Sequence, residues 1–431
     1  MASSISILND LDEYTPVYNR MEICVNETDA PTKALTDYKY IFDIYIENVS
    51  SPTYYRYEVE PDDVLGYGAV DIGRYCESAV NNTMSSYDSD VPYSLGANAN
   101  GTQSIIKVTV KYGYSYSNSG VYTVVANTVT GSAKYAFNGS FDNQFFFNSI
   151  YQGTFPSTYL LNTTNSTSGQ FLTDNKTNKV SIANLGWHHI LTDQPTQIDR
   201  LKIVTYDSAG TIIQTVVKAN GVSQALTSSR MLKVATGPKT LNNISGAFVS
   251  GAQPIITSSV ASYTVQVIEG ASTAISELLY FEIEEPCRYV QRRLHFLNRF
   301  GSFDSFNFNL RSQGKREVSR KAYKYDKYPI TSSGIDRKFT EFQQVTNFVK
   351  TQDTMSLRSE FITEAENEWL KQLIESPEIY LEELDGAGDY NFTTVESIAG
   401  TSWIEKATSI DKLFTMDVEI KFSQVNHRQR R

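Results

Sequence analysis

The sequence predicts a mainly β, multi-domain protein with a β-rich N-terminal domain, an Ig-like sandwich, and a C-terminal β-sheet domain with one packed helix. The first observation is composition, because 28 Tyr and 22 Phe accompany many Thr, Val and Ile, which favour pleated strands. The second is length, since 431 residues suffice for about two to four domains. The third is a regular alternation of apolar and polar residues at 413–422.

A β-rich domain with one short helix is predicted for residues 1–135. Residues 38–47 alternate as a strand, and 54–59 form its partner across a turn that contains Pro52. Apolar residues between 71 and 80 recur at the spacing of an amphipathic helix, for which Asp71 is a candidate cap. Further strands are predicted at 105–112 and 121–126.

Two more segments are predicted before the C-terminal domain. Residues 136–195 are predicted to form a β-region with exposed polar loops, because 162–178 is polar with few apolar side chains. Residues 196–285 contain short strands separated by turns, such as the hairpin at 201–217. They are predicted to form an Ig-like or fibronectin-like β-sandwich. The segment lacks a Cys…Trp…Cys pattern, so antibody-type kinship is not predicted.

Residues 286–431 are predicted to form a β-domain that carries a helix at 364–376. Thr363 and Glu366 have the spacing of a capping box, which opens a helix, and Pro377 stands where the helix should stop. In the last strand, Phe414 and every second residue after it are apolar as far as Phe422, so one face is expected to pack on a core.

The sequence contains no familiar catalytic or nucleotide-binding motif. Its three Cys lie far apart, and the adjacent His188 and His189 would face opposite sides of a strand. We therefore predict no catalytic, cofactor-binding or metal-binding residues and no enzyme activity. Acidic pairs such as Glu382 and Glu383 leave a polysaccharide hydrolase as a lesser alternative, because glycoside hydrolysis needs two nearby carboxylates. No stretch approaches the roughly 18 apolar residues that span a bilayer, so no membrane partner is predicted.

The segment 288–327 differs from the rest of the chain in charge. It holds eleven Lys or Arg against three Asp or Glu, whereas the whole chain has a net charge of −10. It also contains a dense run of Phe between 296 and 308. One interpretation is a hairpin whose Phe side chains face a core while the basic side chains stay solvated. The other is an interface with an acidic neighbouring subunit, since Arg and aromatic residues are enriched at protein contacts.

Nucleic acid is a less favoured partner for this segment, because the protein is acidic overall with a pI of about 5.1. We therefore take the segment as a candidate subunit interface. The candidate interface residues are Arg288, Arg292, Arg293, Phe296, Arg299, Phe300, Phe303, Arg311, Lys315, Arg316, Arg320 and Lys321.

The segment 294–308, LHFLNRFGSFDSFNF, resembles a signature of virion proteins from tailed bacteriophages that infect Bacteroidetes. In those proteins a hairpin with this pattern follows an Ig-like module. The helix and strands after it, beginning near Trp369, are similar too, and the resemblance covers about residues 255–425. It implies a structural protein of the tail or of a tail-proximal ring, made in the host cytoplasm and located in the virion.

The resemblance implies two kinds of partner. One is the chain itself, in a symmetric ring or another homo-oligomer, and the other is neighbouring virion proteins with acidic surfaces. The alternative function is a receptor- or glycan-binding fibre or head decoration protein. The Ig-like region and the Asn- and Ser-rich loops at 81–103 and 162–178 favour that alternative.

Overall fold

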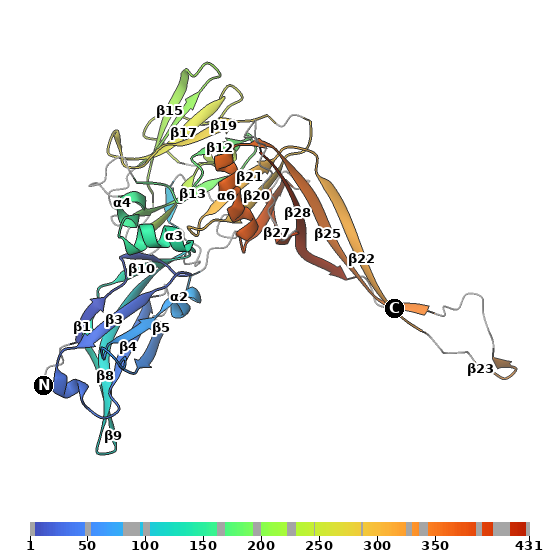
Figure 1. Cartoon of the computed structure of the whole chain (residues 1–431). Coiled ribbons are helices and arrows are strands. Elements are labelled where there is room, and N and C mark those ends of the chain that lie inside the picture. Colours follow the sequence, from blue (N-terminus) through green and yellow to red (C-terminus); the bar gives the residue numbers. More distant parts are fainter. Residues whose placement is uncertain are drawn as a thin grey trace. The chain divides into compact units, whose positions relative to one another are not determined.

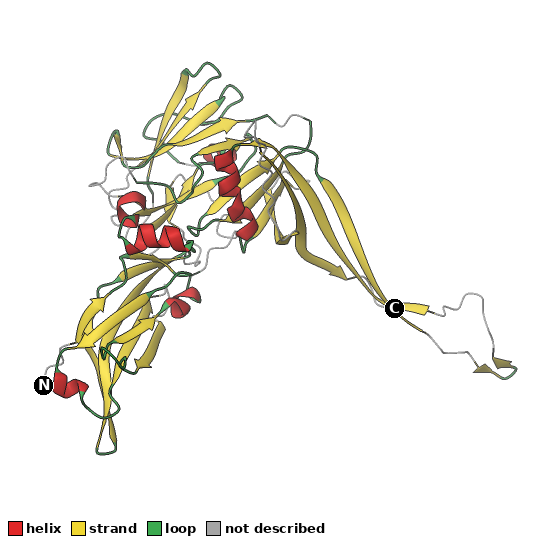
Figure 2. Ribbon diagram, in the orientation of Figure 1, coloured by secondary structure: helices red, strands yellow, loops and turns green. Residues whose placement is uncertain are grey.

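The computed structural model describes residues 5–47, 53–80, 95–97, 104–161, 169–192, 200–221, 230–244, 246–285, 288–324, 330–335, 344–384, 390–399 and 414–427. Most of these residues lie in the strands of several β-sheets, with short helices between them (Figure 2). The predicted mainly β, multi-domain fold is therefore confirmed.

The chain divides into two compact units. The first comprises Met1–Glu285 and Leu297–Ser305, and the second comprises Pro286–Phe296 and Phe306–Arg431. The chain therefore passes from one unit to the other three times. Between the second and third passes lies the short segment Leu297–Ser305, which contains the turn of a hairpin and belongs to the first unit.

Two sheets enclose the core of the N-terminal part (Figure 1). Ile23 from one sheet packs in the same core as Tyr40 and Phe42 from the other, and all three are fully buried or nearly so. The smaller sheet has the order β1 (Ile5–Asn9), β3 (Glu22–Glu27), β6 (Gly68–Asp71). The larger has the order β2 (Tyr14–Pro16), β10 (Lys134–Phe137), β8 (Ile105–Asn118), β4 (Lys39–Glu47), β5 (Thr53–Val59), and β9 (Val121–Thr130) also pairs with β8.

Two short helices, not one, lie within the described part of residues 1–135. The predicted helix is α2 (Gly73–Glu77), and the Asp71 carboxylate accepts a hydrogen bond from the backbone N–H of Gly73 at its start. The second helix is α1 (Ala30–Lys33). It is a single turn without an amphipathic repeat, so periodicity did not predict it.

The middle of the chain forms two further sheets that face each other. Tyr263 stacks on Phe281 at 4.8 Å within one sheet and donates a 2.6 Å hydrogen bond to the Thr236 carbonyl beyond the end of the other. The four-stranded sheet has the order β11 (Leu160–Leu161), β13 (Trp187–Thr192), β16 (Met231–Ala235), β7 (Leu95–Ala97). The six-stranded sheet has the order β12 (Thr177–Val180), β19 (Leu279–Ile283), β17 (Ser262–Glu269), β14 (Arg200–Tyr206), β15 (Ile212–Ala219), with β18 (Thr273–Ala274) beside β17.

Strands from the two predicted segments of this region share both sheets. β12 and β13 belong to 136–195, yet β12 pairs with β19 and β13 pairs with β16. The predicted limit at 195/196 stays a prediction, although strand pairing crosses it twice. Among the described residues, the helical segments of this region that have assigned bounds are α3 (Asn143–Phe146), η2 (Phe147–Tyr151), α4 (Phe155–Tyr159) and α5 (Pro238–Asn242).

The second unit is a seven-stranded sheet with one packed helix, as predicted. Helix α6 (Glu364–Glu375) begins with the predicted capping box of Thr363 and Glu366. Trp369 and Leu373 of the helix pack on the core that the sheet forms. The strand order is β21 (Phe303–Phe308), β20 (Arg292–Leu297), β26 (Ile379–Leu384), β27 (Tyr390–Ala399), β28 (Phe414–His427), β25 (Gln344–Ile362), β22 (Gln313–Lys324).

Strand β28 confirms the predicted alternation, because Met416, Val418 and Ile420 are buried in this core. Strand β22 differs from it, since all twelve of its residues are exposed. Among the described strands, β22 pairs only with β25, and this pairing extends past the end of β28 as far as Lys324 and Gln344 (Figure 1). We call β22 and the part of β25 paired with it, residues 344–356, the ribbon. The short strands β23 (Ile330–Thr331) and β24 (Gly334–Ile335) lie between its two strands in the sequence.

Candidate functional site

The twelve candidate interface residues fall into three groups in the structure. Four are buried inside the chain, namely Arg293, Phe296, Phe300 and Phe303. Arg292 and Arg299 are partly buried and form ion pairs within the chain. Six are exposed, namely Arg288, Arg311, Lys315, Arg316, Arg320 and Lys321. The structure therefore places the aromatic part of the segment in cores and leaves its basic part on the surface.

Phe300 lies in the turn between β20 and β21 and fills an aromatic core of the first unit. Its ring centre is 5.0 Å from that of Tyr159 and 5.4 Å from that of Phe141. The side chain is fully buried. A ring in this position has no surface to offer a neighbouring subunit, so the core interpretation applies to Phe300.

Asn298 and Gly301 shape this turn. The Asn298 side chain accepts hydrogen bonds of 3.0 Å from the backbone N–H groups of Phe300 and Ser302, and it donates one of 2.9 Å to the Leu172 carbonyl. Gly301 has a φ of +73°, and a Cβ there would lie 1.9 Å from the carbonyl oxygen of Asn138. Glycine is therefore required for the chain to approach so closely.

Arg299 is held within the first unit by two carboxylates and a ring. Its guanidinium group lies 2.7 Å from Asp174, 3.4 Å from Asp142 and 4.1 Å from the centre of the Phe145 ring. These contacts compensate its positive charge inside the chain. Arg299 therefore fits a structural role better than a role in binding an acidic partner.

Arg293 belongs to a buried polar cluster in the second unit. Glu382 accepts a 2.6 Å hydrogen bond from Nε2 of His295 and lies 3.6 Å from Nε of Arg293, which donates a 2.7 Å bond from Nη1 to Asn307. Burial lowers the pKa of His295 below its ordinary value, and the hydrogen bond with Glu382 opposes this shift. Just outside the cluster, Arg292 pairs with Glu383 at 3.1 Å.

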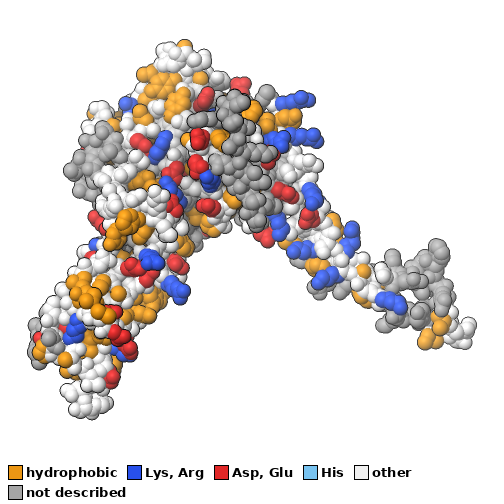
Figure 3. Space-filling view, viewed as in Figure 1, with side chains coloured by type: hydrophobic (Ala, Val, Ile, Leu, Met, Phe, Trp, Pro, Cys, Tyr) orange, Lys and Arg blue, Asp and Glu red, His pale blue; other side chains and the backbone are white. Residues whose placement is uncertain are grey.

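Two of the exposed basic residues are paired on the surface of the ribbon. Arg316 forms a bidentate pair with Asp353 at 2.6 and 2.8 Å, and Lys315 contacts Glu317 at 2.8 Å. Within the part of the chain that the structure describes, Arg311, Arg320 and Lys321 form no ion pair. Figure 3 shows Lys and Arg side chains along the ribbon. The ribbon is therefore a basic surface with uncompensated charge.

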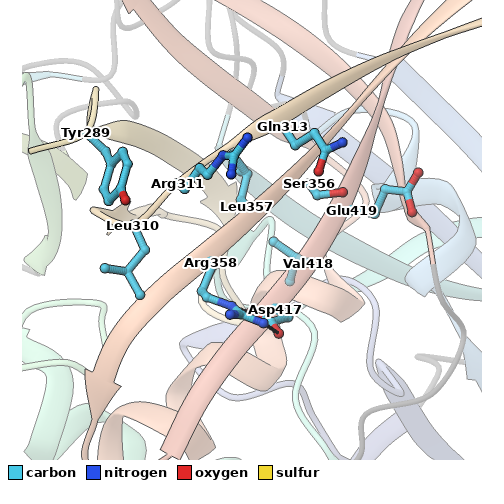
Figure 4. A pocket seen from close by; sticks show the side chains of 10 residues that line it. All are labelled: Tyr289, Leu310, Arg311, Gln313, Ser356, Leu357, Arg358, Asp417, Val418 and Glu419. Carbon is cyan, nitrogen blue, oxygen red and sulfur yellow. Dashed lines mark hydrogen bonds and ion pairs between the residues drawn. The ribbon is translucent and has the colours of Figure 1, made fainter.

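A groove of about 700 Å³ lies on the sheet of the second unit where the ribbon begins (Figure 4). Leu357 and Val418 are its buried apolar residues, and Arg358 forms a bidentate pair with Asp417 at 2.6 and 2.7 Å. Its lining residues are Tyr289, Leu310, Arg311, Gln313, Ser356, Leu357, Arg358, Asp417, Val418 and Glu419. The paired charges make the groove nearly neutral, so Arg311 is its one unpaired cation among the described residues.

His188 and His189 face different neighbours, as predicted for adjacent residues of a strand. Nδ1 of His188 lies 2.8 Å from the Thr236 hydroxyl, and Nδ1 of His189 lies 2.7 Å from the Ser302 hydroxyl. The described residues contain no group of three or more His, Cys, Asp or Glu that could hold a metal ion. No helix in the described part of the chain has the length and apolar character needed to cross a membrane.

The sequence indicated a hairpin in this segment, but it did not indicate the contacts of the Asn298 turn or the ribbon as a separate feature. A Gly between Phe300 and Ser302 was the available signal for the turn. The signal for the ribbon was the run of basic residues from Lys315 to Lys324 with few apolar neighbours.

Comparison with known proteins does not place the chain in a family. No protein-family model matches the sequence, and no curated protein is similar to it at a significant level. Among solved structures, the chain is weakly similar to a crystal structure of Salmonella alpha-2-macroglobulin, with 6% sequence identity and a TM-score of 0.15. That match covers 99% of this chain and 34% of the other, so the chain spans about a third of that protein's length. A TM-score this low supports no structural or functional argument.

Proposed function

We propose that the chain is a non-enzymatic structural component of a bacteriophage particle, a subunit of the tail or of a tail-proximal ring. In this role it assembles with copies of itself and with neighbouring virion proteins. The segment 294–308, which carries the resemblance to virion proteins, corresponds to β20, the Asn298 turn and β21. The hairpin that the resemblance implies is therefore present in the fold.

The ribbon is the observation that carries the proposal. Beyond Lys350, where the pairing of β25 with β28 ends, the ribbon consists of two strands only among the described residues. A two-stranded segment has little stability in water unless another surface covers it. Its outer strand β22 is exposed along all twelve residues and has a free edge among the described strands. A free edge of this length invites pairing with another chain, and an assembly uses such an edge as a joint.

The test is the composition of purified particles of the phage that encodes the chain. Quantitative mass spectrometry should find the chain at a fixed ratio to the major tail protein, and the ratio should not change through repeated density-gradient purification. Cryo-electron microscopy of the same particles should place a seven-stranded sheet with an extended ribbon in a symmetric ring. Loss of the chain from particles during purification would refute the proposal.

A second candidate function is binding of a glycan receptor, and one observation favours it. Phe147 and Tyr151 are 52% and 69% exposed, and their rings stack at 5.2 Å with an angle of 17° between the planes. Exposed aromatic faces suit contact with sugar rings. Most of the two loops that the sequence favoured for this role, residues 81–94, 98–103 and 162–168, lies outside the described residues.

Glycan-array binding by the full chain tests this second function. The double variant Phe147→Ala/Tyr151→Ala should lose the signal if the exposed rings hold the sugar. A control variant, Tyr122→Ala, removes another exposed ring, from strand β9 rather than from η2, and should leave the signal intact. Absence of any signal from the unaltered chain would exclude this candidate.

A further inference from the structure

We propose that the basic strand β22 of one copy docks along the edge strand β5, which has no net charge, and along the acidic loop that follows it, residues 60–67, on a second copy. This inference rests on the proposed self-assembly and names the two surfaces that make the contact. Because the two surfaces differ, the contact is heterologous, and repetition of such a contact produces a closed ring when the rotation between copies allows it.

The first argument is charge. Residues 1–80 contain fifteen Asp or Glu against five Lys or Arg, and this excess equals the net charge of the whole chain. Strand β22 contains five Lys or Arg against one Glu. Oppositely charged surfaces on identical chains attract one copy to the next, and like-charged surfaces prevent other pairings.

The second argument is the loop after β5, residues 60–67. The Asp62 carboxylate accepts hydrogen bonds from the backbone N–H groups of Val64 and Leu65 at 3.0 and 2.8 Å. Backbone bonds of 2.8 Å from Asp62 N–H to the Tyr67 carbonyl and from Gly66 N–H to the Asp62 carbonyl close the loop. This bonding holds Val64 and Leu65 outward, 86% and 59% exposed. Two adjacent apolar side chains held in water beside acidic residues are typical of a contact surface.

The third argument is that both surfaces are sheet edges. Among the described strands, β5 pairs only with β4, and β22 pairs only with β25. Exposed apolar side chains accompany both edges, Tyr57 on β5 and Val318 and Tyr323 on β22. Edge strands from two chains can join through backbone hydrogen bonds, and the flanking side chains then decide which edges join.

Charge reversal in the full-length chain tests the contact. One variant, Arg320→Glu/Lys321→Glu, reverses the charge at two adjacent positions and lowers the net charge of β22 from +4 to zero, without removing an ion pair among the described residues. The other, Glu60→Lys/Asp63→Lys, makes the loop basic at the cost of one exposed 3.4 Å pair with Lys39. The control Lys202→Glu/Lys239→Glu makes the same change in net charge as the first variant, at positions on β14 and α5 that belong to neither surface. Thermal unfolding of each variant should match the unaltered chain, since none of these side chains is buried.

Sedimentation velocity at low salt gives the decisive readout. Each reversed variant alone should self-associate at least about tenfold more weakly than the unaltered chain, because like charges then meet across the contact. The control should associate normally. An equal mixture of the two reversed variants should associate again, since the two Glu side chains introduced on β22 of one now meet the two Lys side chains introduced in the loop of the other. Only a contact between molecules allows two defective variants to repair each other.

Three results would overturn the inference. The first is normal association by the β22 variant, and the second is a mixture that stays dissociated. The third is a β22 variant that loses only binding to DNA or RNA, which would assign the ribbon to nucleic acid.

The result of this association test can be distinguished from the result of the particle test of the proposed function. A mixture that fails, with the chain at a fixed ratio in particles, refutes only this inference. A mixture that works, with the chain absent from particles, refutes only the virion role.

Discussion

The carboxylate of Glu382 accepts a 2.6 Å hydrogen bond from His295 inside the second unit, while the neighbouring Glu383 bonds Arg292 near the surface at 3.1 Å. Glu382→Ala removes the hydrogen-bond acceptor of His295 and the carboxylate 3.6 Å from Arg293 in a buried site, so we expect a loss of about 3–5 kcal/mol in the free energy of unfolding. Glu383→Ala should cost about 1 kcal/mol or less, because a partly exposed pair contributes little. Denaturant unfolding of both variants checks this, and equal losses would contradict the assigned burial.

Acid should destabilise the protein before its carboxylates titrate. Burial lowers the pKa of His189 well below its ordinary value, and the positive charge of Lys233 adds to this effect. The unfolded chain therefore binds a proton near pH 6.5 that the folded chain does not. Stability is complete above that pH and falls as the pH decreases, by at most about 1.4 kcal/mol per pH unit for each such His.

The variant His189→Gln checks this pH dependence. It removes one titrating group, so its unfolding free energy between pH 7.5 and pH 5.5 should fall less steeply than that of the unaltered chain. Both chains need to be measured by denaturant unfolding in the same buffers. Identical slopes would mean that His189 takes up its proton over the same pH range in the folded and the unfolded chain.

Phe300→Ala should destabilise the first unit by about 3–5 kcal/mol, because it empties part of an aromatic core. Phe147→Ala removes the same ring from an exposed position and should change stability by about 0.5 kcal/mol or less. Melting of both variants by calorimetry provides the comparison. A Phe300→Ala variant that melts normally but fails to assemble would restore Phe300 to the subunit interface.

Gly301→Ala should be far more damaging than Gly210→Ala. Both glycines have a positive φ, +73° and +80°, so each pays the same conformational cost of about 1 kcal/mol when a Cβ is added. Only at Gly301 would the new Cβ also collide with a backbone carbonyl, that of Asn138, while nothing lies within 4 Å at Gly210. The two variants should therefore differ in unfolding free energy, and equal values would contradict the close approach of the turn.

Local signals in the sequence predicted helix α6 and strand β28 well. The capping box at Thr363 and the alternation from Phe414 to Phe422 are each decided by residues that lie close together in the chain. The burial of two residues of α6 departs from what their residue types suggest, because Ala365 is exposed and Asn367 is buried. Such details depend on where the helix sits over the sheet, which the sequence of the helix does not contain.

The burial of the aromatic part of segment 288–327 depends on residues that are distant in the sequence. Phe300 is buried by Phe141 and Tyr159, which lie about 150 residues earlier in the chain. Arg299 is neutralised by Asp142 and Asp174 in the same way. Because these partners are non-local, the sequence alone left core and interface as equal interpretations of the segment. For the exposed strand β22, the sequence showed the excess of basic residues but not the position of the strand. Whether a strand lies at the edge of a sheet depends on which other strands pair with it, and those strands are distant in the sequence.

The three passes of the chain between the units determine how the protein can be cut into fragments. A fragment that ends at residue 285 retains every sheet of the first unit but lacks Asn298, Arg299 and Phe300, so its aromatic core has a hole. A single proteolytic cut after Glu285 likewise leaves the units joined through the two ends of the hairpin turn. Independent expression of the first unit therefore requires residues 297–305 to be supplied by a linker, and a truncation series that ignores this would mistake a missing loop for an unstable domain.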